Sequence, residues 1–302
     1  ARGGLMMPLR VAVIGCGRIA TGEHLPAYRA AAEAGLAELV GVCDVDLARA
    51  QAAARPYGVP AFANVDELLA RTQPEAVSIA TLPVTHRDLV LQALDAGCHV
   101  LCEKPVAMNV AEAEEMVSAA ERAGRLFSIC FEYRYWEESI YLRERIAAGD
   151  FGHIHAVRTW GGRPRDFPYF RPRAQAGGGV LTHWTIHNID LALWLLGHPE
   201  PRTASAFGYQ RLPPLPPGSI VFESKPVAPG QEAVEIEDFA MGFVRLAGDT
   251  ILTVEANYLQ PPSQRPEGWE LLGDLGAASI WPLHVWIDNG TEWVDDTPAP
   301  GT

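Results

Sequence analysis

Short apolar runs alternate with longer segments of helical periodicity along the first 130 residues. The apolar runs have the length and composition of buried strands, and they cover residues 9–14, 38–43, 76–80, 98–102 and 126–131. Two of the helical segments between them are followed by Gly97 and Gly124, at the position where helices typically end. Strands that alternate with helices predict βαβ units and a doubly wound parallel sheet.

The pattern changes after residue 130. Helical periodicity covers residues 136–148 and 180–196, and the remaining apolar segments read as strands at 153–160, 239–246, 250–258, 269–272 and 277–281. Short turns between these strands favour a mostly antiparallel open sheet, with one face packed on helices or on another subunit. We therefore expect an α/β domain at residues 1–130 and an α+β domain at residues 131–302.

Composition and charge exclude several classes of protein. The chain has 302 residues, 48% of them hydrophobic, and a net charge of −13. No cluster of Lys and Arg is present, so we expect no nucleic-acid partner. No apolar run reaches the ~18–20 residues that span a bilayer, so we expect no membrane segment. The five cysteines form no C-x-x-C pair, which favours reduced thiols in a cytoplasmic protein.

A glycine-rich turn follows the first predicted strand. Its sequence, Gly15-Cys16-Gly17-Arg18-Ile19-Ala20, is G-x-G-x-x-A and leads into a helix. Gly15 permits the tight turn, Gly17 lets the backbone approach a pyrophosphate, and Ala20 allows close packing of helix on strand. Backbone N–H groups of the turn and of the helix start, at Arg18 and Ile19, would hold the negative charge. This motif predicts a dinucleotide site.

The second predicted strand ends in an acid, Asp44, about two dozen residues beyond the glycine turn. At this separation a carboxylate accepts hydrogen bonds from the adenosine ribose. A carboxylate also repels the extra phosphate of NADP, and Asp46 adds to that field. No Lys or Arg lies between Asp44 and Arg49. We therefore expect NAD rather than NADP, the alternative being that Asp44 only caps the next helix.

Two further strand ends carry polar groups. Thr81 and His86 follow the strand at 76–80 and are expected to line the nicotinamide pocket, unless Thr85 simply caps the next helix. Glu103, Lys104 and Pro105 follow the strand at 98–102. Because ligands bind beyond the carboxyl ends of strands in such sheets, we expect Glu103 and Lys104 to contact the cofactor or a small polar substrate. The alternative is a surface charge pair before a helix.

Four segments together resemble the Gfo/Idh/MocA oxidoreductase family: VAVIGCGRIA, VGVCDVD, CEKPVA and HNIDLALWLLG. The resemblance runs from about residue 9 to 197 and, more loosely, to 281. It implies an N-terminal NAD-binding Rossmann domain and a C-terminal domain for substrate binding and oligomerisation, hence a homodimer or homotetramer. It also implies NAD(P)-dependent oxidation of a sugar or cyclitol hydroxyl, or the reverse reduction.

The resemblance implies roles for two residues and raises a question about a third. Lys104 would touch nicotinamide and substrate and stabilise an alkoxide, while His187 would be the acid/base. Many relatives have aspartate four residues before that histidine, where this chain has His183. His183 could replace the aspartate as a catalytic or substrate-binding group, could be structural, or could bind a metal with His187. Since no third ligand is evident, we predict no metal site.

Candidate substrate ligands lie in the loops of the second half. We expect Arg134, Trp160 and Arg163 to join His183 and His187 in binding substrate, because aromatic faces and guanidinium donors suit a polyhydroxyl or anionic ligand. Solvated loop arginines are the alternative. Two other functions stay open: transient oxidation by retained NAD that enables glycoside cleavage or epimerisation, and cofactor sensing without catalysis. Many relatives also carry a further helix after the sheet, so we expect a trimmed protein or a missing segment.

Overall fold

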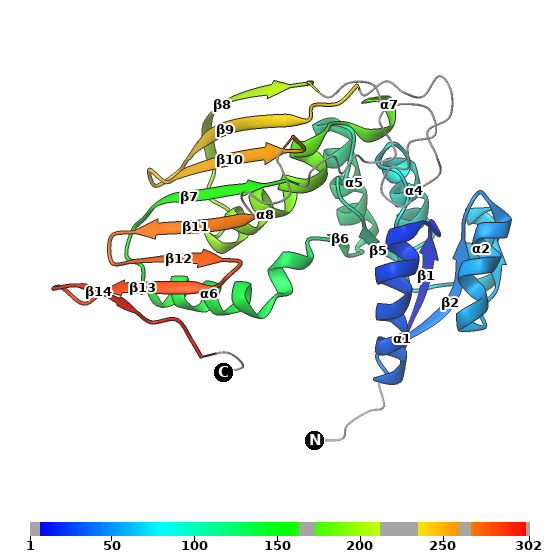
Figure 1. The fold of residues 1–302 in the computed structure, drawn as a ribbon. Coiled ribbons are helices and arrows are strands. Elements are labelled where there is room, and N and C mark those ends of the chain that lie inside the picture. The colour runs from blue at the N-terminus through cyan, green and yellow to red at the C-terminus, as the bar shows by residue number, and fades with distance from the viewer. Residues whose placement is uncertain (1–6, 163–172, 212–234, 260–266, 300–302) are drawn as a thin grey trace. The chain divides into compact units, whose positions relative to one another are not determined.

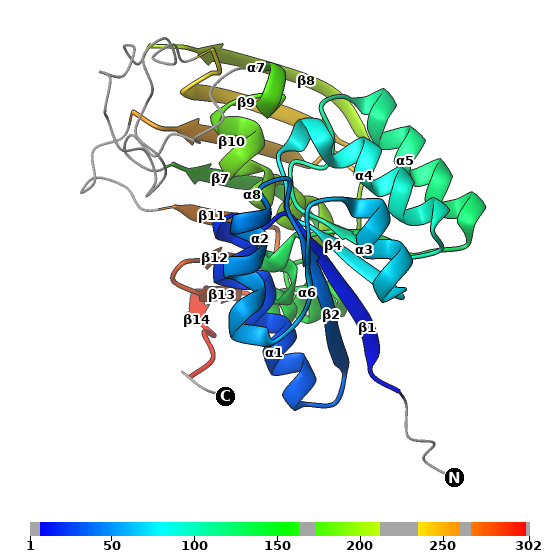
Figure 2. The ribbon, with the colours of Figure 1, turned by 90° about the vertical axis from the view of Figure 1, so that its right-hand side faces the viewer.

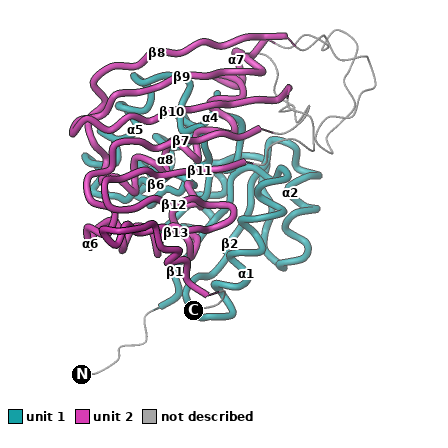
Figure 3. Tube along the Cα trace, turned by 60° about the vertical axis from the view of Figure 1, so that its left-hand side comes forward, with its two compact units in different colours: residues 1–130 teal, residues 131–302 magenta. Residues whose placement is uncertain are grey.

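The computed structural model describes residues 7–162, 173–211, 235–259 and 267–299. Contacts divide the chain into two units, unit 1 (Ala1–Cys130) and unit 2 (Phe131–Thr302), which are coloured separately in Figure 3. The two units are described in turn. No helix among the described residues is long and apolar enough to cross a membrane.

Unit 1 contains a six-stranded sheet with the strand order β3-β2-β1-β4-β5-β6. Every pairing in it is parallel. The order reverses at β1, which lies between β2 and β4, and the carboxyl ends at such a reversal form the ligand site of doubly wound folds. The strands are β1 (Leu9–Ile14), β2 (Ala37–Cys43), β3 (Ala61–Phe62), β4 (Ala76–Ile79), β5 (His99–Cys102) and β6 (Phe127–Ile129).

Helices cover both faces of this sheet (Figure 2). They are η1 (Ala20–His24), α1 (Leu25–Glu33), α2 (Leu47–Ala54), η2 (Arg55–Tyr57), α3 (Val65–Thr72), α4 (Pro83–Asp95) and α5 (Val110–Ala123). Alternate residues of β1 enter different cores, because side chains alternate across a strand. Val13 packs with Leu25 and Ala50 of α1 and α2, whereas Ile14 packs in a core with Val90 and Met116 of α4 and α5. Each face of the sheet is thus buried under its own layer of helices.

Unit 2 contains an eight-stranded sheet with the order β14-β13-β12-β11-β7-β10-β9-β8 (Figure 1). Its pairings are antiparallel except for β7 with β10, which are parallel. The predicted fold class, a parallel Rossmann sheet plus a mostly antiparallel open sheet, is therefore confirmed. The strands are β7 (Ile154–Gly161), β8 (Pro201–Tyr209), β9 (Phe239–Leu246), β10 (Ile251–Asn257), β11 (Gly268–Gly273), β12 (Gly276–Ile280), β13 (His284–Asp288) and β14 (Trp293–Asp295).

One face of the second sheet is covered by helices. The helical segments of unit 2 are η3 (Glu132–Tyr135), α6 (Glu137–Ala148), α7 (Arg173–Ala176), η4 (Leu181–Thr185) and α8 (Ile186–Leu195). Leu142 of α6 and Leu191 of α8 pack in one core with Val157 and Leu252 from the centre of the sheet. This core fixes α8, and with it His187, against the inner face of the sheet.

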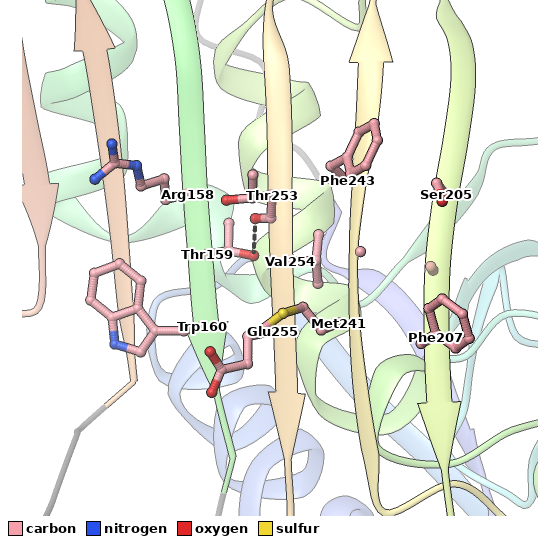
Figure 4. A pocket seen from close by; sticks show the side chains of 12 residues that line it. Arg158, Thr159, Trp160, Ser205, Phe207, Met241, Phe243, Thr253, Val254 and Glu255 are labelled. Carbon is pink, nitrogen blue, oxygen red and sulfur yellow. Dashed lines mark hydrogen bonds between the residues drawn. The ribbon is translucent and has the colours of Figure 1, made fainter.

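The opposite face, here called the outer face, carries two rows of side chains that run across the strands (Figure 4). One row is Arg158, Thr253, Phe243 and Ser205, and the next is Trp160, Glu255, Met241 and Phe207. The large apolar members are unusually open to solvent, since Phe207 is 73% and Met241 50% exposed. These residues line a shallow hollow of about 490 Å³ on the sheet.

Candidate functional site

The glycine turn after β1 fits tightly against the end of β4. Gly15 has φ +92°, which L side chains rarely adopt, and an added Cβ would lie 2.5 Å from the carbonyl oxygen of Ala80. The turn is fixed by hydrogen bonds from Gly15 N–H to the Cys43 carbonyl and from Ala80 N–H to the Ile14 carbonyl. Only glycine fits at position 15, because both the conformation and the space exclude a side chain.

Gly17 differs from Gly15 in its surroundings. A Cβ built at Gly17 meets no atom of the protein within 4 Å. The helical segment begins directly afterwards, where Arg18 and Ile19 are exposed and Ala20 is fully buried. A bare backbone that faces open space at a helix start is the arrangement that lets a pyrophosphate approach N–H groups. The residues of this turn therefore fit a dinucleotide.

Asp44 lies at the end of β2 and is only 7% exposed. Its carboxylate accepts hydrogen bonds from Cys16 N–H at 2.9 Å and Asp46 N–H at 2.9 Å, so it holds the glycine turn to the second strand. Arg49 of α2 reaches back and contacts both carboxylate oxygens at 3.1 and 3.3 Å. Asp46, not Asp44, caps α2 through bonds from Ala48 and Arg49 N–H, so the alternative of Asp44 as a mere cap is wrong.

His86 is placed differently from the expectation. Its ring is fully buried, with Nδ1 3.0 Å from the Pro105 carbonyl oxygen and Nε2 3.2 Å from the Thr81 carbonyl oxygen. Burial lowers the pKa of His86, while the two carbonyl acceptors act in the opposite direction. The expected direct contact of His86 with a cofactor is therefore corrected: its ring connects two loops, and Thr81 is the more exposed partner.

The loop after β5 carries Glu103 and Lys104. The Glu103 side chain is 15% exposed, and its carboxylate lies 3.0 Å from His24 Nε2 and accepts a bond from Lys104 N–H at 3.2 Å. His24 Nδ1 lies 2.8 Å from Ser78 Oγ, which in turn accepts a bond from the Tyr28 hydroxyl at 3.1 Å. In this arrangement His24 Nε2–H donates to the Glu103 carboxylate.

The charge on Glu103 follows from this network. Burial acts to raise the pKa of Glu103, but the hydrogen bond from His24 and the charges of His24 and Lys104 outweigh it and lower that pKa below its ordinary value. Glu103 is therefore an anion, and His24, the last residue of η1, holds its carboxylate in place. The alternative of a solvated surface charge pair does not fit a carboxylate with a buried histidine partner.

One group of three candidate metal ligands occurs among the residues that the structure describes. The donor atoms of His24, Glu103 and Cys130 lie within 4.8 Å of one another. The hydrogen bonds of His24 to Glu103 and Ser78 account for this clustering without an ion. His183 and His187 belong to no such group in the described parts of the chain, and we assign no metal to this pair or to the group of His24, Glu103 and Cys130.

In unit 2, His187 lies in α8 with its side chain 7% exposed. Tyr133 stacks on the imidazole with ring centroids 4.8 Å apart, and Phe131 meets it edge-on at 6.2 Å. Tyr133 is itself packed against Trp136 at 4.3 Å and Trp281 at 5.0 Å. This aromatic packing holds the plane of the imidazole, as a directional proton acceptor requires.

Arg134 and Asp190 form an ion pair next to this ring. The guanidinium donates from Nε to Oδ2 at 2.7 Å and from Nη2 to Oδ1 at 2.5 Å, a two-point geometry. The bond to Asp190 raises the pKa of Arg134. The pair connects η3 to α8, so the structure gives Arg134 a positioning role, and its contact with substrate remains a prediction.

The other expected substrate ligands of unit 2 lie in different places. His183 is buried in η4, one turn before His187, at 7% exposure. Trp160 lies on the outer face of the sheet in the row of Glu255, whereas its neighbours Thr159 and Gly161 point toward the α8 side. Trp160 therefore cannot line a site with His187, because adjacent residues of a strand face opposite ways. Arg163 lies outside the described residues.

The structure adds residues that the sequence pattern does not single out. His24 follows the glycine turn and contacts the loop of Lys104, and Glu132 brings its carboxylate 3.3 Å from His187 Nδ1. Both contacts join residues more than fifty positions apart, so no local periodicity could reveal them. A usable signal was the polar residue just beyond a strand end, which describes Glu132 after β6.

Comparison with known proteins agrees with this architecture. Residues 9–131 match the oxidoreductase family with an NAD-binding Rossmann fold, and residues 140–279 match the GFO/IDH/MocA C-terminal domain. D-glucoside 3-dehydrogenase of Escherichia coli (strain K12) is 31% identical over 94% of this chain and 80% of its own length. 1,5-Anhydro-D-fructose reductase of Ensifer adhaerens is 32% identical over 66% of this chain and 60% of its own length.

A solved structure supports the same assignment. GenD2 from gentamicin A biosynthesis, in complex with NAD, superposes with a TM-score of 0.78 and 26% identity, covering 92% of this chain and 74% of that one. Its overlap extends over both units, as do the two family matches. The chain therefore belongs to the Gfo/Idh/MocA family of oxidoreductases, with an NAD-binding Rossmann domain at its N-terminus.

Proposed function

We propose that this protein transfers a hydride between nicotinamide and the hydroxyl or carbonyl carbon of a sugar, cyclitol or related polyol. The observation that carries the proposal is the turn at Gly15 and Gly17, which presents an open backbone at a helix start in a chain of this family. The names of the relatives, a glucoside dehydrogenase and an anhydrofructose reductase, support the substrate class.

The cofactor would be held by unit 1. The turn from Gly15 to Ala20 would bind the pyrophosphate, and Asp44 the adenosine ribose, while Thr81, Glu103 and Lys104 would contact the nicotinamide end. When bound, NAD supplies the hydride acceptor, so that the substrate's C–H electron pair leaves as hydride and its O–H proton leaves separately. One CH–OH group and NAD⁺ thus yield one carbonyl, NADH and a proton.

Lys104 and His187 would handle the charge and the proton. The Lys104 ammonium would stabilise the negative charge that develops on the substrate oxygen, and the anionic Glu103 would keep that ammonium in place. His187 would take the hydroxyl proton at a ring nitrogen, because a neutral imidazole accepts a proton near neutral pH. In the reverse direction the same histidine would return the proton to the carbonyl oxygen.

The cofactor preference would follow from Asp44 and its partner. The buried carboxylate would favour the ribose hydroxyls of NAD over the phosphate of NADP. Arg49, which contacts Asp44, reduces this negative field, so the preference for NAD would be moderate rather than absolute. The sequence shows only that Arg49 is the first basic residue after Asp44. The contact between the two side chains comes from the structure.

The outer face of the unit 2 sheet would bind a second copy of this chain. Eight strands spaced about 4.8 Å apart and about 20 Å long present about 700 Å², close to the ~800 Å² per partner of a stable interface. The face combines exposed Phe207, Met241 and Phe243 with charges of both signs, Arg158 beside Glu270 at 3.6 Å. Balanced charges on one surface permit self-pairing despite the net charge of −13.

The test is a panel of sugars, cyclitols and polyols mixed with protein and NAD while the absorbance of reduced nicotinamide is followed. We expect turnover with at least one member and a loss of at least a hundredfold in Lys104→Ala, with NAD still bound. Cofactor that co-purifies and never exchanges would instead favour redox-assisted glycoside cleavage or epimerisation. Tight NAD binding without turnover of any member, in either direction, would favour a cofactor sensor.

A further inference from the structure

His187 lacks the carboxylate that the family resemblance places one helical turn before it, since this chain has His183 there. A histidine that takes a proton on one ring nitrogen is usually oriented by a partner on the other, which fixes the tautomer and stabilises the imidazolium. In the structure a carboxylate from another segment lies next to the His187 ring. Glu132 Oε2 lies 3.3 Å from His187 Nδ1, although the two residues are far apart in the sequence.

The position of Glu132 is set by the residues that follow it. Tyr133 stacks on the His187 ring with an interplanar angle of 27°, and it also packs against Trp136 and Trp281. Arg134 is bound at two points to Asp190, which lies three residues after His187 in α8. Two consecutive residues of η3 are thus attached to α8, and the backbone of Glu132 is fixed beside the imidazole.

We propose that Glu132 is the positioning carboxylate of His187, taking the place of the aspartate that His183 replaces; this inference rests on the proposed function of His187. At 3.3 Å the contact is a close charge contact and not an aligned hydrogen bond, so Glu132 acts through its charge. That charge favours the neutral tautomer with its proton on Nδ1 and leaves Nε2 to receive the proton of the substrate hydroxyl. The negative charge of Glu132 then stabilises the imidazolium that forms. The substrate hydroxyl loses its proton to Nε2, and the C–H electron pair leaves as hydride to the bound cofactor.

Among the described residues of unit 2, the other charged groups near His187 have partners of their own. Asp190 is paired with Arg134, and Glu267 accepts a bond from the Tyr133 hydroxyl at 3.5 Å, while Tyr133 presents the face of its ring to His187. His183, one turn earlier, carries no negative charge, and Arg143 of α6 lies over Trp194 near the far end of α8. Because the Glu132 side chain is 56% exposed, water screens its charge, and its stabilisation of the imidazolium is as modest as that of other partly solvated ion pairs.

The closing experiment compares Glu132→Gln with Glu137→Gln. Both variants remove one carboxylate from neighbouring exposed positions, and Glu137, at the start of α6, serves as the control. In Glu132→Gln the oxidation rate at saturating substrate falls roughly two- to fivefold, and the acidic limb of the pH profile of kcat/KM moves down by about half a pH unit. The sign follows because a nearby anion favours the protonated imidazole, so its removal lets the base become neutral at lower pH.

A second readout needs no turnover. Nuclear magnetic resonance of ¹⁵N-histidine-labelled protein, with His187→Gln to assign the ring, gives the titration midpoint and tautomer of His187. A lower midpoint in Glu132→Gln, with loss of Nδ1–H preference, supports the proposal even if no polyol is oxidised and the proposed function fails. Turnover of a polyol with Glu132→Gln indistinguishable from Glu137→Gln in both readouts overturns it while the proposed function stands.

Discussion

His24 connects the helix that follows the glycine turn to the loop that carries Lys104. Its two ring nitrogens contact Ser78 Oγ and Glu103 Oε1, and both His24 and Ser78 are buried. A largely buried carboxylate that loses its imidazole partner bears an uncompensated desolvation cost. The imidazole therefore stabilises unit 1 and fixes the anion next to Lys104.

We predict that His24→Leu lowers the free energy of unfolding by about 1–3 kcal/mol at neutral pH, the cost of an unsatisfied buried group. The difference should shrink in acid. Because the folded state lowers the pKa of Glu103, the stabilisation is present above its ordinary pKa and is lost as pH falls through the folded value. Urea unfolding as a function of pH measures this, and a difference that grows toward acid pH would contradict the ion-pair account.

The pair of Asp44 and Arg49 predicts opposite changes in cofactor preference. Asp44→Asn removes the charge that rejects a phosphate, so we expect the ratio of NADP to NAD dissociation constants to fall by about tenfold. Arg49→Ala leaves the Asp44 charge unneutralised, so the ratio should rise. Titration of both cofactors by calorimetry measures the ratios, and changes of the same sign in both variants would be inconsistent with this electrostatic explanation.

Some site residues could be foreseen from the sequence and others could not. Gly15, Gly17 and Asp44 lie in a motif whose spacing encodes its own geometry, and Lys104 directly ends an apolar run. His24 and Glu132 act through contacts made only by tertiary packing. Trp160 was assigned wrongly because the strand alternation places the largest apolar side chain on the outer face, where a sequence pattern expects polar residues.

Among elements, the turn that joins β1 to η1 allows a matched comparison of two glycines. In Gly15→Ala a Cβ would meet the Ala80 carbonyl at 2.5 Å with φ at +92°, so we expect a loss of stability of about 2 kcal/mol or more. In Gly17→Ala nothing lies within 4 Å, so stability should change by less than about 0.5 kcal/mol.

Gly17→Ala, which should hardly change the stability of the free protein, should nevertheless change its affinity for NAD. Gly17→Ala should weaken NAD binding by about tenfold or more, because the methyl group occupies the space through which the pyrophosphate reaches the backbone. Thermal unfolding with and without NAD measures both effects. The account of the turn is wrong if Gly17→Ala unfolds as readily as Gly15→Ala, or if NAD stabilises Gly17→Ala as much as the wild type.

The elements that the sequence predicts are those whose own side chains enter a core. β1, β2, β4 and β5 are apolar runs, and α5 ends at Gly124 in the left-handed conformation as expected. β8 was not predicted, because all nine of its residues are exposed and its pairing with β9 uses the backbone. β3 has two residues and β14 three, and their pairing partners likewise appear only in the folded sheet.

At the scale of the whole molecule, the outer face predicts self-association. Replacing both Met241 and Phe243 by lysine puts two positive charges where two copies would meet, and we expect monomers in light scattering after size exclusion. The control replaces the exposed Gln51 and Ala52 of α2 by lysine, which gives the same charge change elsewhere. A monomeric wild-type protein at micromolar concentration, or unchanged association of the Met241 and Phe243 variant, would exclude this interface.

The family matches extend over both units, at residues 9–131 and 140–279, and D-glucoside 3-dehydrogenase aligns with 94% of the chain. The proposed function depends on one step: hydride transfer from a polyol carbon to NAD, with the help of Lys104 and His187. This transfer can be followed with an isotope label instead of a reaction rate. A label detects it even where the cofactor is retained and returned to its oxidised form.

The most direct measurement is the transfer of deuterium from carbon-deuterated sugars and cyclitols to the nicotinamide, detected by mass spectrometry of the recovered cofactor. We predict deuterium on the nicotinamide for at least one substrate with the wild-type protein. We predict at least a hundredfold less in Lys104→Ala and in His187→Ala. Recovered NAD that carries no deuterium after incubation with every member of the panel, despite saturating binding, would contradict the account.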